Sequence, residues 1–168
     1  MRSERDDSTN RVCTAGFARI AFFIPPTGAY CREDRCQSRF RFELIPSLRA
    51  PMEECEAAGA IRAAGGEACI VDAPGEGLDE SAAFARLRAF EPDLVVLVVT
   101  FATLAFDLAL AKRVRESMSG GAIAVRGAPV FVFSEKILEQ APDVDFCVRG
   151  EYELVFGSLV ARPYDEVA

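Results

Sequence analysis

An unbroken aliphatic run, Leu94 to Val99, lies between Asp93 and Thr100 in the middle of the sequence. Neighbouring side chains of a strand point to opposite faces, so a strand here would be apolar on both faces. Such a strand is typical of the centre of a parallel sheet that helices cover on both sides. Ligands of these sheets bind beyond the carboxyl ends of the strands, which makes Thr100 to Thr103 the first candidates for a site.

Four other apolar runs predict further strands, at residues 19–24, 67–71, 121–125 and 144–148. Helical patterns alternate with them, at residues 51–64, 79–90, 103–118, 134–138 and 151–160, and residues 126–129 are expected to form a turn after the fourth strand. Strands that alternate with helices need right-handed crossovers. We therefore predict a doubly wound, Rossmann-like or flavodoxin-like α/β domain in three α/β/α layers. Its expected strand order is 2-1-3-4-5, and 3-2-1-4-5 stays open.

The length of 168 residues fits one domain. Residues 1–18 are charged and without periodicity, so we interpret them as a disordered lead. The α/β domain is expected over residues 19–161, and residues 162–168 as a tail or the start of a linker to a further domain. The segment from 25 to 50 is long for a loop in a compact domain, and its aromatic and basic residues favour either a solvated excursion or a flap or docking surface.

Composition narrows the classes of partner. The net charge of -7 leaves no dense basic surface for phosphates, which argues against nucleic acid as a partner. No apolar run reaches the roughly 20 residues needed to cross a bilayer, and the polar amino terminus does not resemble a signal peptide. We therefore expect a cytoplasmic protein.

The chemistry-bearing residues exclude several kinds of site. The sequence has six cysteines without a CxxC pair and no histidine, which removes histidine-based catalysis and histidine metal sites. Neither GxGxxG nor GxxxxGK[ST] is present. Three of the cysteines are expected in the core, Cys55, Cys69 and Cys147, and three aspartates are interpreted as structural residues at strand ends, Asp72, Asp93 and Asp145. We assign no catalytic and no metal-ligating residue.

Four blocks of sequence resemble a known family in the same order. Residues 51–73, PMEECEAAGAIRAAGGEACIVDA, resemble without a gap the pattern P-L-G-L-x-x-L-A-A-x-L-R-x-A-G-H-E-V-x-V-x-D-A. EPDLVVL at 91–97, VRGAP at 125–129 and VDFCVRGE at 144–151 follow. The chain thereby resembles the cobalamin-binding domain of cobalamin-dependent radical S-adenosylmethionine enzymes, the class of anaerobic magnesium-protoporphyrin cyclase and hopanoid-modifying enzymes.

The resemblance implies a corrinoid across the carboxyl ends of the strands, with its nucleotide tail beside the sheet. By position, it implies eight cofactor-binding residues: Thr100, Thr103, Arg126, Gly127, Ala128, Arg149, Gly150 and Glu151. The threonines would offer hydroxyl groups, and the glycine at 127 would let the tail approach the backbone. For the threonines, a purely structural role in ending the strand and capping the helix is an equal alternative to cofactor binding. For the glycine at 127, the alternative is a simple turn.

Two departures from the family limit what the chain would do. Without histidine, cobalamin would be held with no imidazole ligand to cobalt from this chain. The CxxxCxxC motif is also absent, so the iron-sulfur cluster and S-adenosylmethionine would belong to a missing radical domain or partner, in cis or in trans. The expected function is a cobalamin-binding module of a radical methyltransferase or cyclase, without catalysis of its own. The alternative is a ligand-free Rossmann-like protein-interaction domain.

Overall fold

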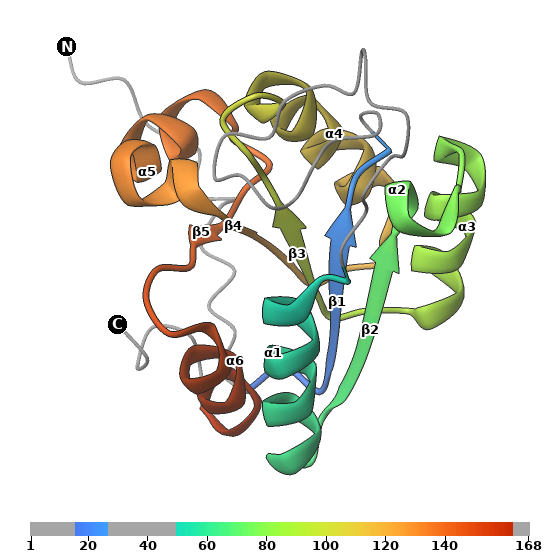
Figure 1. The fold of residues 1–168 in the computed structure, drawn as a ribbon, viewed down its shortest axis with the longest axis vertical. Coiled ribbons are helices and arrows are strands. Elements are labelled where there is room, and N and C mark those ends of the chain that lie inside the picture. The colour runs from blue at the N-terminus through green and yellow to red at the C-terminus, as the bar shows by residue number, and fades with distance from the viewer. Residues whose placement is uncertain (1–15, 27–49, 163–168) are drawn as a thin grey trace, which may run out of the picture.

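Five parallel strands form one sheet in the order β2-β1-β3-β4-β5, which confirms the predicted fold class and strand order (Figure 1). The structure is a computed structural model that describes residues 16–26 and 50–162. The strands are β1 (Arg19–Ile24), β2 (Glu67–Asp72), β3 (Leu94–Val98), β4 (Ala122–Arg126) and β5 (Phe146–Cys147). Neighbouring strands pair in parallel throughout, so their carboxyl ends meet at one edge.

β3 lies at the centre of the sheet and is covered on both faces, as its unbroken aliphatic run predicted. Val96 pairs with Phe22 of β1 on one side and with Ala124 of β4 on the other. Val95 and Leu97 belong to one apolar cluster and Val96 to a second on the opposite face. The alternation of β3 thus divides the core into two halves.

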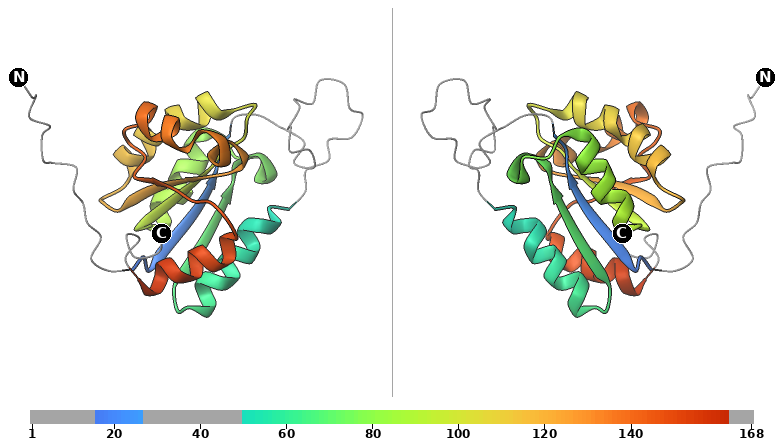
Figure 2. Two further views of the ribbon diagram at one scale, coloured as in Figure 1. Left: turned by 90° about the vertical axis from the view of Figure 1, so that its left-hand side faces the viewer. Right: turned by 90° about the vertical axis from the view of Figure 1, so that its right-hand side faces the viewer.

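Helices cover the two faces unequally (Figure 2). α1 (Met52–Ala63) and α6 (Tyr152–Ala161) lie side by side on one face, which we call the α1/α6 face. α3 (Glu80–Phe90), α4 (Leu104–Ser117) and α5 (Ala128–Gln140) cover the other. A single short turn of helix, α2 (Ala73–Glu76), follows β2 and was not expected from the sequence.

The three aspartates interpreted as structural residues have that role. Asp93 accepts hydrogen bonds from the backbone N–H groups of Ala18 (2.7 Å) and Arg19 (3.0 Å). Asp145 accepts one from the N–H of Ile123 (2.7 Å), and Asp72 caps α2. Each carboxylate therefore satisfies backbone groups at a strand or helix end.

The helix predicted to begin at Ser134 begins earlier. α5 starts at Ala128, with Pro129 in its first turn and Gly127 at the N-cap, and β4 extends to Arg126, so the predicted turn over 126–129 is wrong except at Gly127. Proline fits a helix start because its missing N–H has no intrahelical partner there. Ser134 is buried inside the helix, next to a kink at Phe133 (φ -123°, ψ 17°). The sequence signal at Ser134 therefore marked an irregularity within the helix.

Other boundaries also moved. Pairing in β5 covers two of the five residues expected there. Phe17, assigned to the lead, is buried among the residues of the α1/α6 face. Cys55 is exposed on α1, so its prediction as a core residue is wrong, whereas Cys69 and Cys147 pack against the core. The predictions for most of the 25–50 loop and of the lead lie outside the described residues.

Within the described part of the chain, the helices are all too short or too polar to span a membrane.

Candidate functional site

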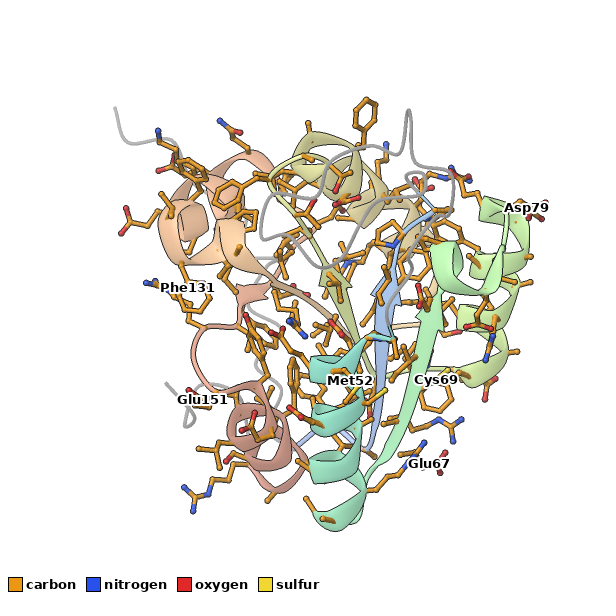
Figure 3. The ribbon with its side chains drawn as sticks, in the orientation of Figure 1. Met52, Glu67, Cys69, Asp79, Phe131 and Glu151 are labelled. Carbon is orange, nitrogen blue, oxygen red and sulfur yellow. The ribbon has the colours of Figure 1, made fainter. Side chains whose placement is uncertain are left out.

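Five of the eight predicted site residues lie at or directly after the carboxyl ends of the neighbouring strands β3 and β4. Val98 pairs with Arg126, and the N–H of Val99 donates to the Arg126 carbonyl (2.9 Å). Thr100 and Thr103 follow β3, and Gly127 and Ala128 follow β4. The remaining three, Arg149, Gly150 and Glu151, form the connection from β5 to α6, and Figure 3 shows Glu151 at the start of that helix.

The two threonines form a hydrogen-bonded network with a carboxylate, which we call the hydroxyl network (Thr100, Thr103 and Asp107). The Oγ1 atoms of Thr100 and Thr103 lie 2.9 Å apart. Thr103 Oγ1 donates to Oδ2 of Asp107, one helical turn further along α4. Thr103 and Asp107 are both almost completely buried, whereas Thr100 is partly exposed. The network therefore runs from the interior of α4 to the carboxyl edge.

The direction of these hydrogen bonds follows from the single hydrogen of each hydroxyl group. Because Thr103 donates to Asp107, it cannot also donate to Thr100. Thr100 must then be the donor in the bond between the two threonines. Its own oxygen keeps acceptor capacity only, so a ligand group at Thr100 has to be a hydrogen-bond donor.

Thr103 occupies the N-cap of α4 but makes no capping bond with its side chain. A capping threonine contributes about 1 kcal/mol to helix stability, and the hydroxyl network replaces that bond. The predicted alternative of helix capping is therefore correct for the position of Thr103, which is the N-cap of α4, but its side chain makes no capping bond.

Gly127 has a structural reason to be glycine. Its φ of +128° disfavours side chains, and a Cβ atom there would lie 2.1 Å from the Val99 carbonyl oxygen. The close approach of β3 and the start of α5 therefore requires this residue with or without a ligand. The proximity of its backbone to a cofactor stays a prediction.

Arg126 points to the α1/α6 face and lies in what we call the charged cluster (Arg126, Glu53, Glu54 and Tyr152). Its Nη1 donates to Oε1 of Glu54 (2.6 Å) and its Nη2 to Oε2 of Glu53. Its guanidinium carbon lies 3.8 Å from the centroid of the Tyr152 ring. Arg126 is 3% exposed, so it is committed to the protein's own side chains.

Burial shifts two ionisable groups near these residues. It raises the pKa of the Tyr152 hydroxyl, an effect that Arg126 opposes. It raises the pKa of the Cys147 thiol to about 11, opposed by the charge of Arg149. Both groups therefore stay neutral at physiological pH, and neither is an activated nucleophile.

The last three predicted residues lie in the connection between β5 and α6. Arg149, Gly150 and Glu151 are exposed. Gly150 has φ +93° with open space where a Cβ would be, so only the backbone conformation favours glycine. None of these three contacts the hydroxyl network in any recorded hydrogen bond, and their role at the pocket edge stays a prediction.

Sequence reasoning missed Asp107, Glu54 and Tyr152. Asp107 had a readable signal, because a carboxylate four residues after a threonine lies on the same side of a helix. Glu54 has no such local signal for its contact. Its contact with Arg126 spans 72 residues, which no local pattern reveals.

An aromatic pair begins at the residue that follows Thr100. Phe101, directly after Thr100, is 47% exposed and packs edge-on against Phe133 of α5, with 6.2 Å between ring centroids. A partly exposed apolar pair beside a half-buried acceptor suits a ligand with an apolar body and polar substituents.

A shallow groove lies elsewhere, between α3 and α4. Its volume is about 440 Å³, and its charged lining residues partly pair with one another, as Arg113 does with Glu80. No predicted site residue lines it. Within the described residues, no group of three or more cysteine, aspartate or glutamate side chains is placed to hold a metal ion.

Comparison with known proteins shows a partial similarity and gives no family assignment. Over 92 residues, 54% of the chain, it is 28% identical to a Pyrococcus horikoshii protein described as an uncharacterized methyltransferase. The chain spans about a fifth (20%) of that relative's length. No protein-family model matches the chain, and no solved structure matches it.

Proposed function

We propose that this chain is a cobalamin-binding module of a larger cobalamin-dependent radical S-adenosylmethionine enzyme, of the methyltransferase or cyclase kind. The partial similarity to a protein described as a methyltransferase supports the methyltransferase side of this proposal. The strand order 2-1-3-4-5 supports a ligand at the carboxyl edge. The module itself supplies binding, and the remaining reaction components belong to a radical domain in cis or in trans.

The observation that carries the proposal is the partly exposed acceptor at Thr100 beside the rings of Phe101 and Phe133. A corrin ring bears amide side chains, whose N–H groups are donors, around a largely apolar macrocycle. The polarity of the hydroxyl network therefore matches an amide at Thr100 and disfavours a phosphate there. Backbone at Gly127 and Gly150 would border the same ligand.

The polar and aromatic residues at the carboxyl edge suit a corrinoid, but they offer no histidine ligand for its cobalt. When bound, the cobalt would supply methyl-carrying or redox chemistry to the radical domain. This chain has no histidine, so it would hold the corrinoid by its periphery and leave cobalt without an imidazole from the protein. What the chain contributes is orientation of the ring and exclusion of water from one side.

Titration with hydroxocobalamin tests this proposal. We expect saturable binding in equilibrium dialysis, with an absorbance spectrum free of histidine ligation. Thr100→Val should weaken binding about tenfold, because an amide N–H would lose its acceptor. Ser81→Ala, in the groove between α3 and α4, is the matched control and should bind as the parent does. No binding of the parent at about 1 mM corrinoid would overturn the proposal.

A second candidate is a protein-interaction domain without a ligand. It is favoured by large apolar side chains in solvent, Phe106 at 71% and Phe131 at 55% exposed, the latter on the side of α5 away from α4 (Figure 3). If this candidate is correct, the protein without bound corrinoid should retain a partner from a cell lysate in a pull-down experiment. Phe131→Ser should abolish that retention, whereas Thr100→Val should leave it unchanged.

A further inference from the structure

Asp107 is buried at the inner end of the hydroxyl network and is bonded to Thr103 twice. Its backbone N–H donates to the Thr103 carbonyl (2.9 Å), and its Oδ2 atom accepts from the Thr103 hydroxyl group. Asp107 is 1% and Thr103 2% exposed, so solvent does not compete for either bond. The two residues therefore form one fixed unit at the start of α4.

This unit determines how Thr100 can bond. Because the single hydrogen of Thr103 goes to Asp107, the hydroxyl group of Thr100, 2.9 Å away, has to donate its own hydrogen to Thr103. An ionised carboxylate only accepts hydrogen bonds, so it holds the chain in this direction. An amide at position 107 could also donate, and the direction would then no longer be fixed. Asp107 thus decides what Thr100 offers to a ligand.

The same carboxylate opposes negatively charged groups at Thr100. It lies two hydrogen bonds away along the network, and burial weakens the screening of its charge by water. A carboxylate or phosphate of a ligand would meet an oxygen with no hydrogen to give and a negative charge behind it. An amide N–H would meet a free acceptor. The network therefore distinguishes neutral donors from anions.

Large apolar side chains stand in solvent on either side of Thr103 in the chain. Phe101, in the loop after β3, is 47% exposed, and Phe106, in the first turn of α4, is 71% exposed. Apolar surface beside a few polar groups is typical of sites where the polar groups fix orientation and specificity. The group that reaches Thr100 is therefore best described as a neutral polar substituent on an apolar body.

We propose that Asp107 sets the ligand specificity of this edge: acting through Thr103, it makes Thr100 an acceptor that takes amides and rejects carboxylates. The inference rests on the proposed function, because its ligand is a corrinoid. Asp107 does not touch the ligand in this proposal, so it is a positioning residue. Its effect is to select corrinoids with intact peripheral amides over those in which an amide is replaced by an acid.

The test compares hydroxocobalamin with its monoacids, in which one peripheral amide is hydrolysed to a carboxylate, each isomer taken separately. Hydrolysis replaces an N–H donor by a charged acceptor. The isomer changed where the ring meets Thr100 should therefore bind the parent at least about tenfold more weakly than hydroxocobalamin does. Equilibrium dialysis at neutral pH measures the dissociation constants, and the ratio of the two constants is the discrimination.

Two variants test the role of Asp107 in this discrimination. Asp107→Asn should reduce it to about threefold or less, because the amide fixes no direction and carries no charge. Thr103→Val keeps the carboxylate but interrupts the network, and it should reduce the discrimination as much. Thr103→Ser restores the hydroxyl group and should restore the discrimination. Because the ratio compares two ligands of one variant, it does not depend on how much of that variant is folded.

Asp79→Asn is the control with the same change of charge. Asp79 caps α3 with its side chain, and asparagine caps a helix about as well as aspartate does. This variant should discriminate between the two ligands as the parent does.

The outcomes separate the role of Asp107 from the function on which it rests. Equal binding of hydroxocobalamin and every monoacid by the parent would overturn that role and leave the proposed function standing. Discrimination that persists in both Asp107→Asn and Thr103→Val would also overturn it. Loss of discrimination in one of these variants alone would overturn the route through Thr103. Binding of no corrinoid by the parent would overturn the proposed function itself.

Discussion

Two polar groups lie at the same edge of the sheet and are built differently. The hydroxyl network after β3 uses one loop and one helix, and it leaves an acceptor at Thr100. The charged cluster after β4 uses side chains from three elements, and it closes a face. The difference shows that residues at equivalent strand ends can have opposite roles, because alternation along the strand decides which face each side chain meets.

The largest effect on stability should come from the charged cluster. Arg126→Ala leaves Glu54 buried without its guanidinium partner, so we expect a loss of about 3 to 5 kcal/mol in the free energy of unfolding. Urea denaturation measures this loss. Glu54→Ala and the double variant complete a cycle in which a coupling of about 1 to 3 kcal/mol is expected. If the losses of the two single variants add up to the loss of the double variant, the two side chains do not interact. The charged cluster could then not be contrasted with the hydroxyl network.

Glycine substitutions should separate close packing from backbone strain. Gly127→Ala combines a positive φ with a clash against the Val99 carbonyl, so it should cost about 2 to 3 kcal/mol in unfolding free energy. Gly150→Ala has a positive φ but open space, and it should cost about 1 kcal/mol. Equal losses in thermal or urea unfolding would mean that the contact between β3 and α5 is looser than described. Gly127 is for the same reason a poor position for testing ligand binding.

The hydroxyl network should be more sensitive at its buried end. Thr103→Val removes the donor to Asp107 and should cost about 2 kcal/mol in unfolding free energy, whereas Thr103→Ser should retain most of the stability. Thr100→Val should cost less, about 1 kcal/mol, because Thr100 is partly exposed. A larger loss at Thr100 than at Thr103 would contradict the expectation that the buried end of the network matters most for stability.

The smallest effect serves as the baseline for these comparisons. Lys112 and Glu116 form an ion pair one turn apart on α4, and both side chains are mostly exposed. Lys112→Ala should therefore change the unfolding free energy by at most about 0.5 kcal/mol. A larger change would show that this exposed ion pair contributes more to the unfolding free energy than a solvent-screened pair should.

The sequence predicted the layers of this fold well because local patterns determine them. The aliphatic run of β3 required cover on both faces, and Asp79 marked the start of α3 by capping it, with its carboxylate 2.8 Å from the Ala82 nitrogen. It failed where two signals competed, as at α5, where Pro129 starts the helix and Ser134 only marks its irregular middle.

For the candidate residues, the sequence predicted their places at the strand ends but not their contacts with other side chains. Thr100 and Thr103 follow from the end of β3, and Asp107 could have been found by helical spacing. The contacts of Arg126 with Glu54 and Tyr152 depend on the packing of α1 against α6, which is a tertiary property. The VRGAP block therefore located Arg126 at the carboxyl edge of the sheet. Only the structure showed that its side chain lies on the α1/α6 face.

Backbone amide shifts in a hydroxocobalamin titration, followed by nuclear magnetic resonance, test the central claim most directly. If the corrinoid lies across the carboxyl edge, the largest shifts should appear at Thr100, Gly127 and Gly150, with Ser81 and Ser117 of the α3/α4 groove unchanged. Largest shifts in that groove, or no shifts at saturating corrinoid, would contradict the account.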